Sequence, residues 1–405
     1  MLHSLQSLLI YVAPFLAVLG LVVTVHEFGH FLAAKACGVA VDRFSIGFGR
    51  ALLSWRDRSG VEWRLAWLPL GGYVRFAGDE NAASVPDADD LQALRREILA
   101  REGQAALDRY FHFKPIWQRA IVVAAGPIAN FVLSVILLTV LLMAVGERSL
   151  PAKVDQLAPG QPAALAGFRS GDVIERADGQ PIDSFEALQQ YVQIRAGSPI
   201  RFTVERGAKV LTLTATPVTH EIDNGLGSKQ KVGVLGIIAS HQPGDLRFRR
   251  YGPLAAVRQG AARTWDMLSS TLVIIERLVT GQLPAEQLSG PLGIAQLSGA
   301  VVHAGAAGEP NLGMKVVGAV TNLLSLAAVL SVSVGFMNLL PVPVLDGGHL
   351  LFYAYEAVAR RPVGARVQAA GYRVGLALLL GLMLFATWND LHRLRVFQFL
   401  GGLFS

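Results

Sequence analysis

Residues 8–34 read LLIYVAPFLAVLGLVVTVHEFGHFLAA, an apolar run interrupted near its end by two histidines and a glutamate. About 20 such residues are enough for a helix to cross the hydrocarbon core of a membrane. Ionisable side chains are costly inside such a helix, so His26, Glu27 and His30 indicate a function. The stretch predicts a transmembrane helix within residues 1–37 that carries a chemical site.

The three ionisable residues form the pattern His-Glu-x-x-His. On a helix, residues four apart share a face, so His26 and His30 can direct both imidazoles at one metal ion. Glu27 then lies close enough to take a proton from an attacking water. The pattern therefore predicts a zinc site with Glu27 as its general base.

A catalytic zinc site needs a third protein ligand and keeps one position open. The candidate is Asp346, in the stretch LDGGH (residues 345–349) at the end of a later apolar run. With ionised Asp346 and Glu27, Zn²⁺ forms a formally neutral set, which reduces the cost of burial. His349 is the rival ligand; we favour Asp346 because a carboxylate completes many His-Glu-x-x-His sites.

The composition is that of a membrane protein. The 405 residues are 52% hydrophobic and 16% charged, with a mean hydropathy of +0.43, whereas about a quarter of a soluble domain is charged. The net charge of +6 comes from scattered Lys and Arg, so no nucleic-acid partner is expected. A single cysteine, Cys37, excludes a disulfide framework and a Cys-rich zinc site. The N-terminus lacks the basic region of a cleavable signal peptide.

Four apolar stretches approach membrane-spanning length, at about residues 8–34, 121–145, 316–345 and 374–388. Residue alternation between the first two predicts short strands, and residues 91–110 an amphipathic helix. We expect a polytopic α-helical membrane protein of about four transmembrane helices, with an inserted α+β domain and a membrane-associated β-rich loop. The expected segments are transmembrane helices at 1–37, 120–146, 315–348 and 373–390, the β-rich loop at 38–119, the α+β domain at 150–220, an amphipathic or linker region at 221–314, a cytoplasmic loop at 349–372, and a tail at 391–405.

The basic residues predict the orientation. The short loop after the third apolar stretch carries Arg360, Arg361 and Arg366, whereas the tail before the first has no Lys or Arg. The positive-inside rule then places both termini outside and the first and third loops in the cytoplasm. The α+β domain would face the extracytoplasmic side.

The motifs resemble the site-2 protease family of intramembrane zinc metalloproteases. The resemblance rests on residues 26–30 (HEFGH) and 338–347 (NLLPVPVLDG), and extends to 125–131 (AGPIANF) and 71–74 (GGYV). With the four-helix layout it covers nearly the whole chain. Residues 154–218 resemble a circularly permuted PDZ domain, through PGQPAALAG (159–167) and GDVI (171–174). There is room for one such domain and not for a tandem pair.

The resemblance implies a function. In such enzymes two histidines and an aspartate bind zinc and the glutamate is the base, roles that fall on His26, His30, Asp346 and Glu27. The family asparagine, here Asn338, is implied to hold substrate backbone or the developing oxyanion. Separately, the strand-like patterning of residues 38–76 predicts an edge strand, with Gly71 and Gly72, to which an extended substrate segment would add. The implied substrates are single-span proteins of the bacterial inner membrane, such as an anti-sigma factor after a first cut, or remnant signal peptides, reached within membrane lipid. The PDZ-like domain would be periplasmic.

Two other classes of function are weaker. A membrane-tethered PDZ scaffold with an inactive metal site has no use for Glu27. A transporter would place ionisable residues on a midplane pathway, which does not explain the spacing of His26 and His30. The sequence therefore favours peptide hydrolysis.

Overall fold

The computed structural model describes residues 2–78, 88–223, 229–239, 247–282, 290–306 and 311–393. The chain divides into two compact units. The first comprises residues 1–141, 256–271 and 289–390, and the second comprises residues 142–255, 272–288 and 391–405.

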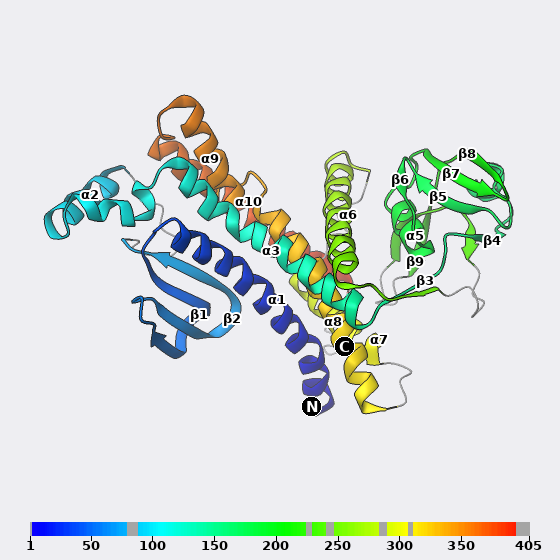
Figure 1. Cartoon of the computed structure of the whole chain (residues 1–405), viewed down its shortest axis with the longest axis horizontal. Helices are drawn as coiled ribbons and strands as arrows, with labels where there is room; N and C mark the ends of the chain where they lie inside the picture. Colours follow the sequence, from blue (N-terminus) through cyan, green and yellow to red (C-terminus); the bar gives the residue numbers. More distant parts are fainter. Residues whose placement is uncertain are drawn as a thin grey trace, which may run out of the picture. The chain divides into compact units, whose positions relative to one another are not determined.

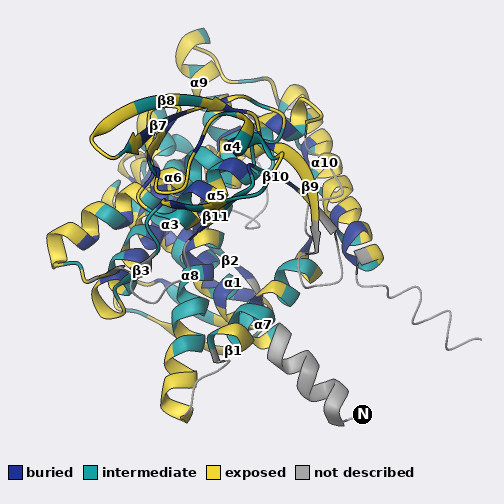
Figure 2. Cartoon of the chain, turned by 90° about the vertical axis from the view of Figure 1, so that its right-hand side faces the viewer, coloured by how far each residue is buried: buried dark blue, intermediate teal, exposed yellow. Residues whose placement is uncertain are grey.

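Four helices of the described residues are long and apolar enough to cross a membrane (Figure 1). They are α1 (Leu2–Ala36), α3 (Ile116–Ala144), α8 (Leu312–Asn338) and α10 (Ala365–Arg393). Much of α10 is exposed (Figure 2), including Leu378 at 57% and Leu384 at 66%. Apolar side chains around a helix suit a lipid environment. The expected number of apolar helices is confirmed.

The boundaries of the last two long helices differ from the expectation. The helix α8 ends at Asn338, not near residue 345. A turn then leads into α9 (Asp346–Ala359), which begins inside the expected transmembrane segment 315–348 and extends into the expected loop 349–372. Prolines at 341 and 343 lack the backbone donors that would extend α8. The helix α10 is also longer than the expected 374–388, because its first turns contain the polar residues that hydropathy penalises.

The region expected as a linker, residues 221–314, contains a further apolar helix of the first unit. This helix, α7 (Pro291–Ala306), packs against α1 and α8. Gly305 lies so close to Gly318 of α8 that a side chain on either would meet the other's backbone. Such small residues let helices approach closely. The helix α7 has 16 residues, fewer than the roughly 20 that a transmembrane helix needs.

A bent sheet follows α1 in the first unit. It consists of β1 (Val41–Arg56) and β2 (Glu62–Phe76). Residues 41–46 of β1 pair with residues 72–76 on one side and with 62–65 on the other, and residues 51–56 pair with 62–66. Glycines 47 and 49, with φ of 88° and 87°, lie where the register shifts. The expected β-rich segment is thus present, with residues 72–76 at one edge of the sheet.

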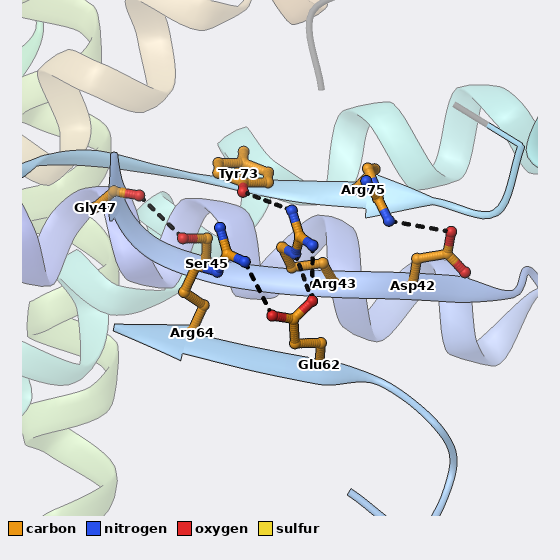
Figure 3. A network of polar contacts seen from close by, with 8 residues as sticks. All are labelled: Asp42, Arg43, Ser45, Gly47, Glu62, Arg64, Tyr73 and Arg75. Atoms are coloured by element: carbon orange, nitrogen blue, oxygen red, sulfur yellow. Dashed lines mark hydrogen bonds and ion pairs between the residues drawn. The ribbon is translucent and has the colours of Figure 1, made fainter. Parts of the chain in front are cut away.

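A polar network ties this sheet together across its strands (Figure 3). Glu62 accepts hydrogen bonds from Arg43 Nε at 2.8 Å and Arg64 Nη2 at 3.0 Å. The Arg43 guanidinium also reaches the Tyr73 hydroxyl at 3.4 Å, and Arg75 approaches Asp42 at 3.6 Å. These contacts join all three neighbouring strand segments and so fix residues 72–76 beside 41–46.

An aromatic core holds the sheet against α1 and α3. Phe31 of α1 packs on Phe44 and Trp63 of the sheet, and Val122 of α3 belongs to the same buried cluster. The helix expected at 91–110 is divided: α2 (Ala88–Arg101) ends before Gly103, whose φ is 82°. Two short 3₁₀ helices follow, η1 (Gln104–Arg109) and η2 (Phe111–Phe113). The left-handed φ at Gly103 explains why the α-helix stops there.

The second unit contains an α+β domain. Its elements are β4 (Val154–Leu157), α4 (Pro162–Leu165), β5 (Val173–Ala177), β6 (Gln180–Pro181), α5 (Phe185–Gln193), β7 (Ile200–Arg206), β8 (Lys209–Ala215), β9 (Val218–Asp223), β10 (Lys229–Val234) and β11 (Ile237–Ala239). One sheet has the order β6-β5-β7-β8, while β11 pairs with β4 and β10 with β9. The core centres on Ile174, Ile200 and Phe202.

The domain does not end at residue 220 as expected. Because β11 pairs with β4, the fold closes only at Ala239. Polar residues between the strands of the β9–β10 hairpin made this region resemble a linker in the sequence.

Two elements follow the domain. The strand β12 (Arg247–Arg249) pairs with β3 (Glu147–Ser149), next to the end of α3 in the sequence. The helix α6 (Pro253–Val279) then runs through residues of both units. Within the first unit it packs on α3, where Thr264 lies 3.2 Å from Ser134 and Gly260 contacts Thr139. This long helix lies within residues 221–314, which were expected to be an amphipathic or linker region.

Candidate metal centre

His26 and His30 lie one turn apart on α1 and face the same way. Their Nε2 atoms are 3.2 Å apart, and the rings meet edge to face with centroids 4.8 Å apart. His26 is buried, with 7% of its surface exposed. The four-residue spacing produces this pairing, as the sequence predicted.

Asp346 completes a cluster with the two histidines. Its Oδ2 atom lies 3.1 Å from His26 Nε2 and 3.4 Å from His30 Nε2. Asp346 begins α9, directly after the turn at 339–345. That turn needs glycines, because a side chain at Gly347 would strike the Leu339 carbonyl and one at Gly348 the Val342 carbonyl. The turn thus returns the chain to α1.

The turn is also fixed from α10. A Cβ at Gly375 would lie 3.2 Å from Pro343 Cδ, and one at Gly371 would lie 3.3 Å from Pro343 Cγ. The two glycines therefore provide space for the proline ring. Close packing here restricts where Asp346 can lie.

The three donors fit a zinc ion. A tetrahedral zinc site with bonds of about 2.0–2.1 Å has ligand–ligand edges of about 3.3 Å. The edges here are 3.1, 3.2 and 3.4 Å. Within the described part of the chain, the buried Oδ2 of Asp346 has no polar neighbour to bond with besides the two imidazole nitrogens. Two nitrogens and one carboxylate oxygen make one face of a tetrahedron and leave a fourth position for water or substrate.

The helix α3 lies against the rings of both histidines. His30 Nδ1 donates to the Val122 carbonyl at 2.8 Å, which leaves its Nε2 lone pair toward the cluster. His26 Nδ1 lies 3.2 Å from the Asn130 side-chain amide. A Cβ at Gly126, midway between, would strike the His30 ring and lie 2.9 Å from His26 Cε1. A glycine is required at that position.

Glu27 follows His26 in the sequence but is not one of the three residues of the donor cluster. It lies beside the sheet. Its Cγ lies 3.3 Å from the place where a Cβ on Gly72 would stand. Gly72 lies on β2 and pairs with Ile46. The structure therefore brings the glutamate beside one of the two glycines singled out in the sequence.

The other expected residues have different surroundings. Gly71, with φ of 150°, lies against the Phe48 ring. The Asn338 amide donates to the Val334 carbonyl of its own helix at 3.0 Å. His349 lies 3.2 Å from the Tyr372 hydroxyl. Of the two candidates for the third ligand, the structure brings Asp346 to the histidines, and His349 is not in the described cluster.

Sequence reasoning assigned no role to Gly126 and Asn130, although both lie in the family-like stretch 125–131. Asn130 is fully buried in α3. A polar residue within a membrane-length apolar run is itself a signal of function. That signal was available for Asn130 but could not tell which partner it has.

Comparison with known proteins gives the family. The model described as peptidase family M50 matches residues 14–382. The chain belongs to this family, the site-2 proteases. MmpA, a metalloprotease of Caulobacter vibrioides, is 54% identical over 397 residues, which cover 98% of this chain and 99% of MmpA.

Two further relatives support the same conclusion. A protein of Agrobacterium fabrum, whose name refers to zinc metalloproteases, is 41% identical over 95% of this chain and 96% of its own. The protease RseP of Yersinia pestis is 30% identical, with 96% and 100% covered. Its alignment extends over 486 positions, more than the 405 residues here. The protein is a zinc-dependent metalloprotease, which confirms the expectations of enzyme class and cofactor.

Proposed function

We propose that this metalloprotease cuts within the transmembrane segment of single-span membrane proteins. The observation that carries the proposal is the position of the donor cluster. His26 and His30 lie on α1, inside a membrane-length apolar helix, and Asp346 follows α8 closely. A hydrolytic site on such helices is suited to substrates that are themselves in the membrane.

In this proposal His26, His30 and Asp346 hold the zinc ion. When bound, zinc supplies Lewis-acid chemistry, polarising the scissile carbonyl and making water more acidic. Glu27 accepts a proton from the attacking water and later delivers it to the departing amine. Asn338 binds substrate backbone or the developing oxyanion, since its amide keeps a second N–H besides the one donated to Val334.

The substrate must be unwound, because a helix ties up its carbonyls in i→i−4 hydrogen bonds. Residues 72–76 form a strand that could hold an unwound substrate segment in an extended conformation. They pair with 41–46 on one side, and Gly72 lies beside Glu27. An extended segment added next to this strand would pass the base without a side chain in the way. We assign substrate binding to Gly71 and Gly72 on this basis.

The α+β domain acts as a PDZ-like selectivity domain on the periplasmic side. The orientation is proposed from Arg360, Arg361 and Arg366, which lie around the start of α10 and favour the cytoplasmic side under the positive-inside rule. Substrates of this class include an anti-sigma factor after a first cut and remnant signal peptides. In both, an earlier cleavage removes bulk outside the membrane.

The test is cleavage of a single-span model substrate by the purified full-length protein in detergent. We expect cuts inside the apolar segment, lost after chelation and restored by added zinc. The products are mapped by mass spectrometry. Metal-dependent cuts confined to soluble loops would contradict intramembrane cleavage, and an absence of any cleavage would favour a scaffold.

A further inference from the structure

The helix α3 presents a row of three positions to the histidines. Val122, Gly126 and Asn130 are four residues apart, so they lie on one face of the helix. The Val122 carbonyl accepts from His30, Gly126 leaves space for both rings, and Asn130 lies against His26. The proposed function explains the first two contacts, and the third raises a question of chemistry.

The contact between Asn130 and His26 joins two nitrogens. Asn130 Nδ2 lies 3.2 Å from His26 Nδ1, and the buried Oδ1 of Asn130 has no hydrogen-bond partner among the residues that the structure describes. In this arrangement Nδ1 must accept, so the proton of a neutral imidazole is on Nε2. Nε2 is the atom that faces Asp346 and His30. A protonated Nε2 cannot bind a metal ion.

Exchange of the amide oxygen and nitrogen resolves both problems. The two atoms have nearly the same shape, so their assignment follows from the hydrogen-bond network. With Oδ1 toward the ring, it accepts from Nδ1–H and the buried oxygen is satisfied. The Nε2 lone pair then faces the cluster.

We infer that Asn130 is a positioning residue whose side-chain oxygen accepts from His26 Nδ1–H and sets the tautomer that binds zinc. The inference rests on His26 being a ligand in the proposed function. Asn130 and Val122 then perform the same task for the two histidines, one with an amide and one with a backbone carbonyl. Acceptors of this kind fix the ring orientation and raise metal affinity.

The packing around Asn130 makes a matched substitution possible. Its backbone carbonyl accepts from Ser331 Oγ at 2.8 Å, a contact that side-chain changes leave in place. A Cβ at Gly335 would lie 3.1 Å from Asn130 Cβ, so space is limited. Asn130→Asp keeps the shape and can only accept at this position, whereas Asn130→Leu keeps the bulk and removes the acceptor. Asn130→Ala removes the acceptor without adding bulk.

The experiment measures zinc affinity of the full-length protein in detergent by competition with a chelating dye, after metal removal. We expect Asn130→Leu and Asn130→Ala to weaken binding by about 10–100-fold, the usual effect of losing such a partner. Asn130→Asp should stay close to wild type. The control is Asn322→Leu, which removes a hydrogen bond to the Val301 carbonyl between α8 and α7 and should leave affinity unchanged.

Melting temperatures identify variants that fail to fold; if Asn130→Leu does, Asn130→Ala carries the test. Wild-type affinity in a folded Asn130→Leu or Asn130→Ala protein would overturn the inference. The inference would also be overturned if Asn130→Asp bound zinc as weakly as Asn130→Leu and Asn130→Ala do. In that case the amide N–H or the packing of Asn130, and not its oxygen, would determine zinc affinity. The variant His26→Ala distinguishes a failure of the proposed ligand set from a failure of the inference about Asn130. If His26→Ala binds zinc with normal affinity, the proposed ligand set is wrong, whatever the Asn130 variants show.

Discussion

The three donors of the cluster are held by different means. Backbone and side-chain groups of α3 orient the two rings, whereas Asp346 depends on a glycine-rich turn that returns to α1. The contacts that join His26, His30 and Asp346 do not involve His349. His349 lies instead against the Tyr372 hydroxyl. The identity of the third ligand is therefore testable by single substitutions.

Asp346→Ala should lower zinc content sharply, because it removes the only carboxylate of the described cluster. His349→Ala should retain zinc and serves as the matched control. Metal content is measured by mass spectrometry on purified protein. The opposite order would move the ligand assignment to His349.

At the residue scale, the sequence predicted what local spacing determines. The turn of a helix pairs His26 with His30, and a motif match singled out Asp346. Asn130 was not predicted as a partner because it is 104 residues from His26, and which face of α3 meets α1 depends on tertiary packing. The structure brings His26, His30 and Asp346 together, but their role as ligands remains a prediction, as do the roles of the other site residues, Glu27, Asn338, Gly71 and Gly72.

At the scale of elements, glycines decide how closely α1 and α3 approach. A Cβ at Gly29 would lie 2.7 Å from the Ala129 side chain, and Gly126 faces both imidazoles. Neither Gly29 nor Gly126 has the left-handed backbone conformation that favours glycine. Glycine is therefore needed at these positions because a larger residue would clash with the neighbouring helix or the imidazole rings. Helix ends were predicted less well than helix positions, because turns such as 339–345 are set by packing on other elements.

Gly126→Ala should reduce zinc affinity and activity, since the added methyl group displaces the His30 ring. The control is Gly381→Ala on α10, where a Cβ would meet nothing within 4 Å. Removing that exposed helical glycine should be neutral or stabilising by up to about 1 kcal/mol. Equal zinc affinity in the two variants would show that the rings tolerate the methyl group.

The α+β domain contains a partly buried ion pair between Asp172 and Arg206. Asp172 accepts from Arg206 Nε at 2.7 Å, from Arg206 Nη2 at 2.8 Å and from the Arg169 amide at 2.8 Å. Burial opposes ionisation of Asp172, but these donors outweigh it, and the pKa of the carboxyl lies below its ordinary value. A lowered pKa stabilises the folded state above about pH 4, and that stability is lost as pH falls through the folded-state pKa.

Asp172→Asn should therefore destabilise the domain at pH 7 by about 1.5–3 kcal/mol, the typical worth of a hydrogen bond to a charged group. The difference from wild type should shrink as pH falls below about 4. Thermal unfolding of the full-length protein at both pH values measures it. A difference that is independent of pH would mean that Asp172 contributes through packing alone.

At the scale of the whole molecule, the chain combines a membrane unit that contains the donor cluster with a unit that contains one α+β domain. All three donors belong to the first unit. Composition and hydropathy predicted four long apolar helices, and residue alternation predicted strands; the described residues contain both. The extent of the domain was not predicted, since pairing of β11 with β4 joins strands about 80 residues apart.

Replacing residues 150–239 with a short flexible linker should change which substrates are cut more than whether they are cut. The domain supplies no donor to the cluster, but it can exclude proteins with large outer domains. Intact and pre-trimmed forms of one substrate are compared with both enzymes. If a folded deletion variant no longer cleaves the trimmed form, the domain is part of the catalytic apparatus.

The most direct test of the central claim is the substitution Glu27→Gln, with zinc content and proteolysis measured on the same preparation. Glu27 is outside the donor set, so the variant should keep its zinc while cleavage of a single-span substrate falls by at least about 100-fold, as for loss of a general base. Full activity in a zinc-loaded Glu27→Gln protein would contradict the account.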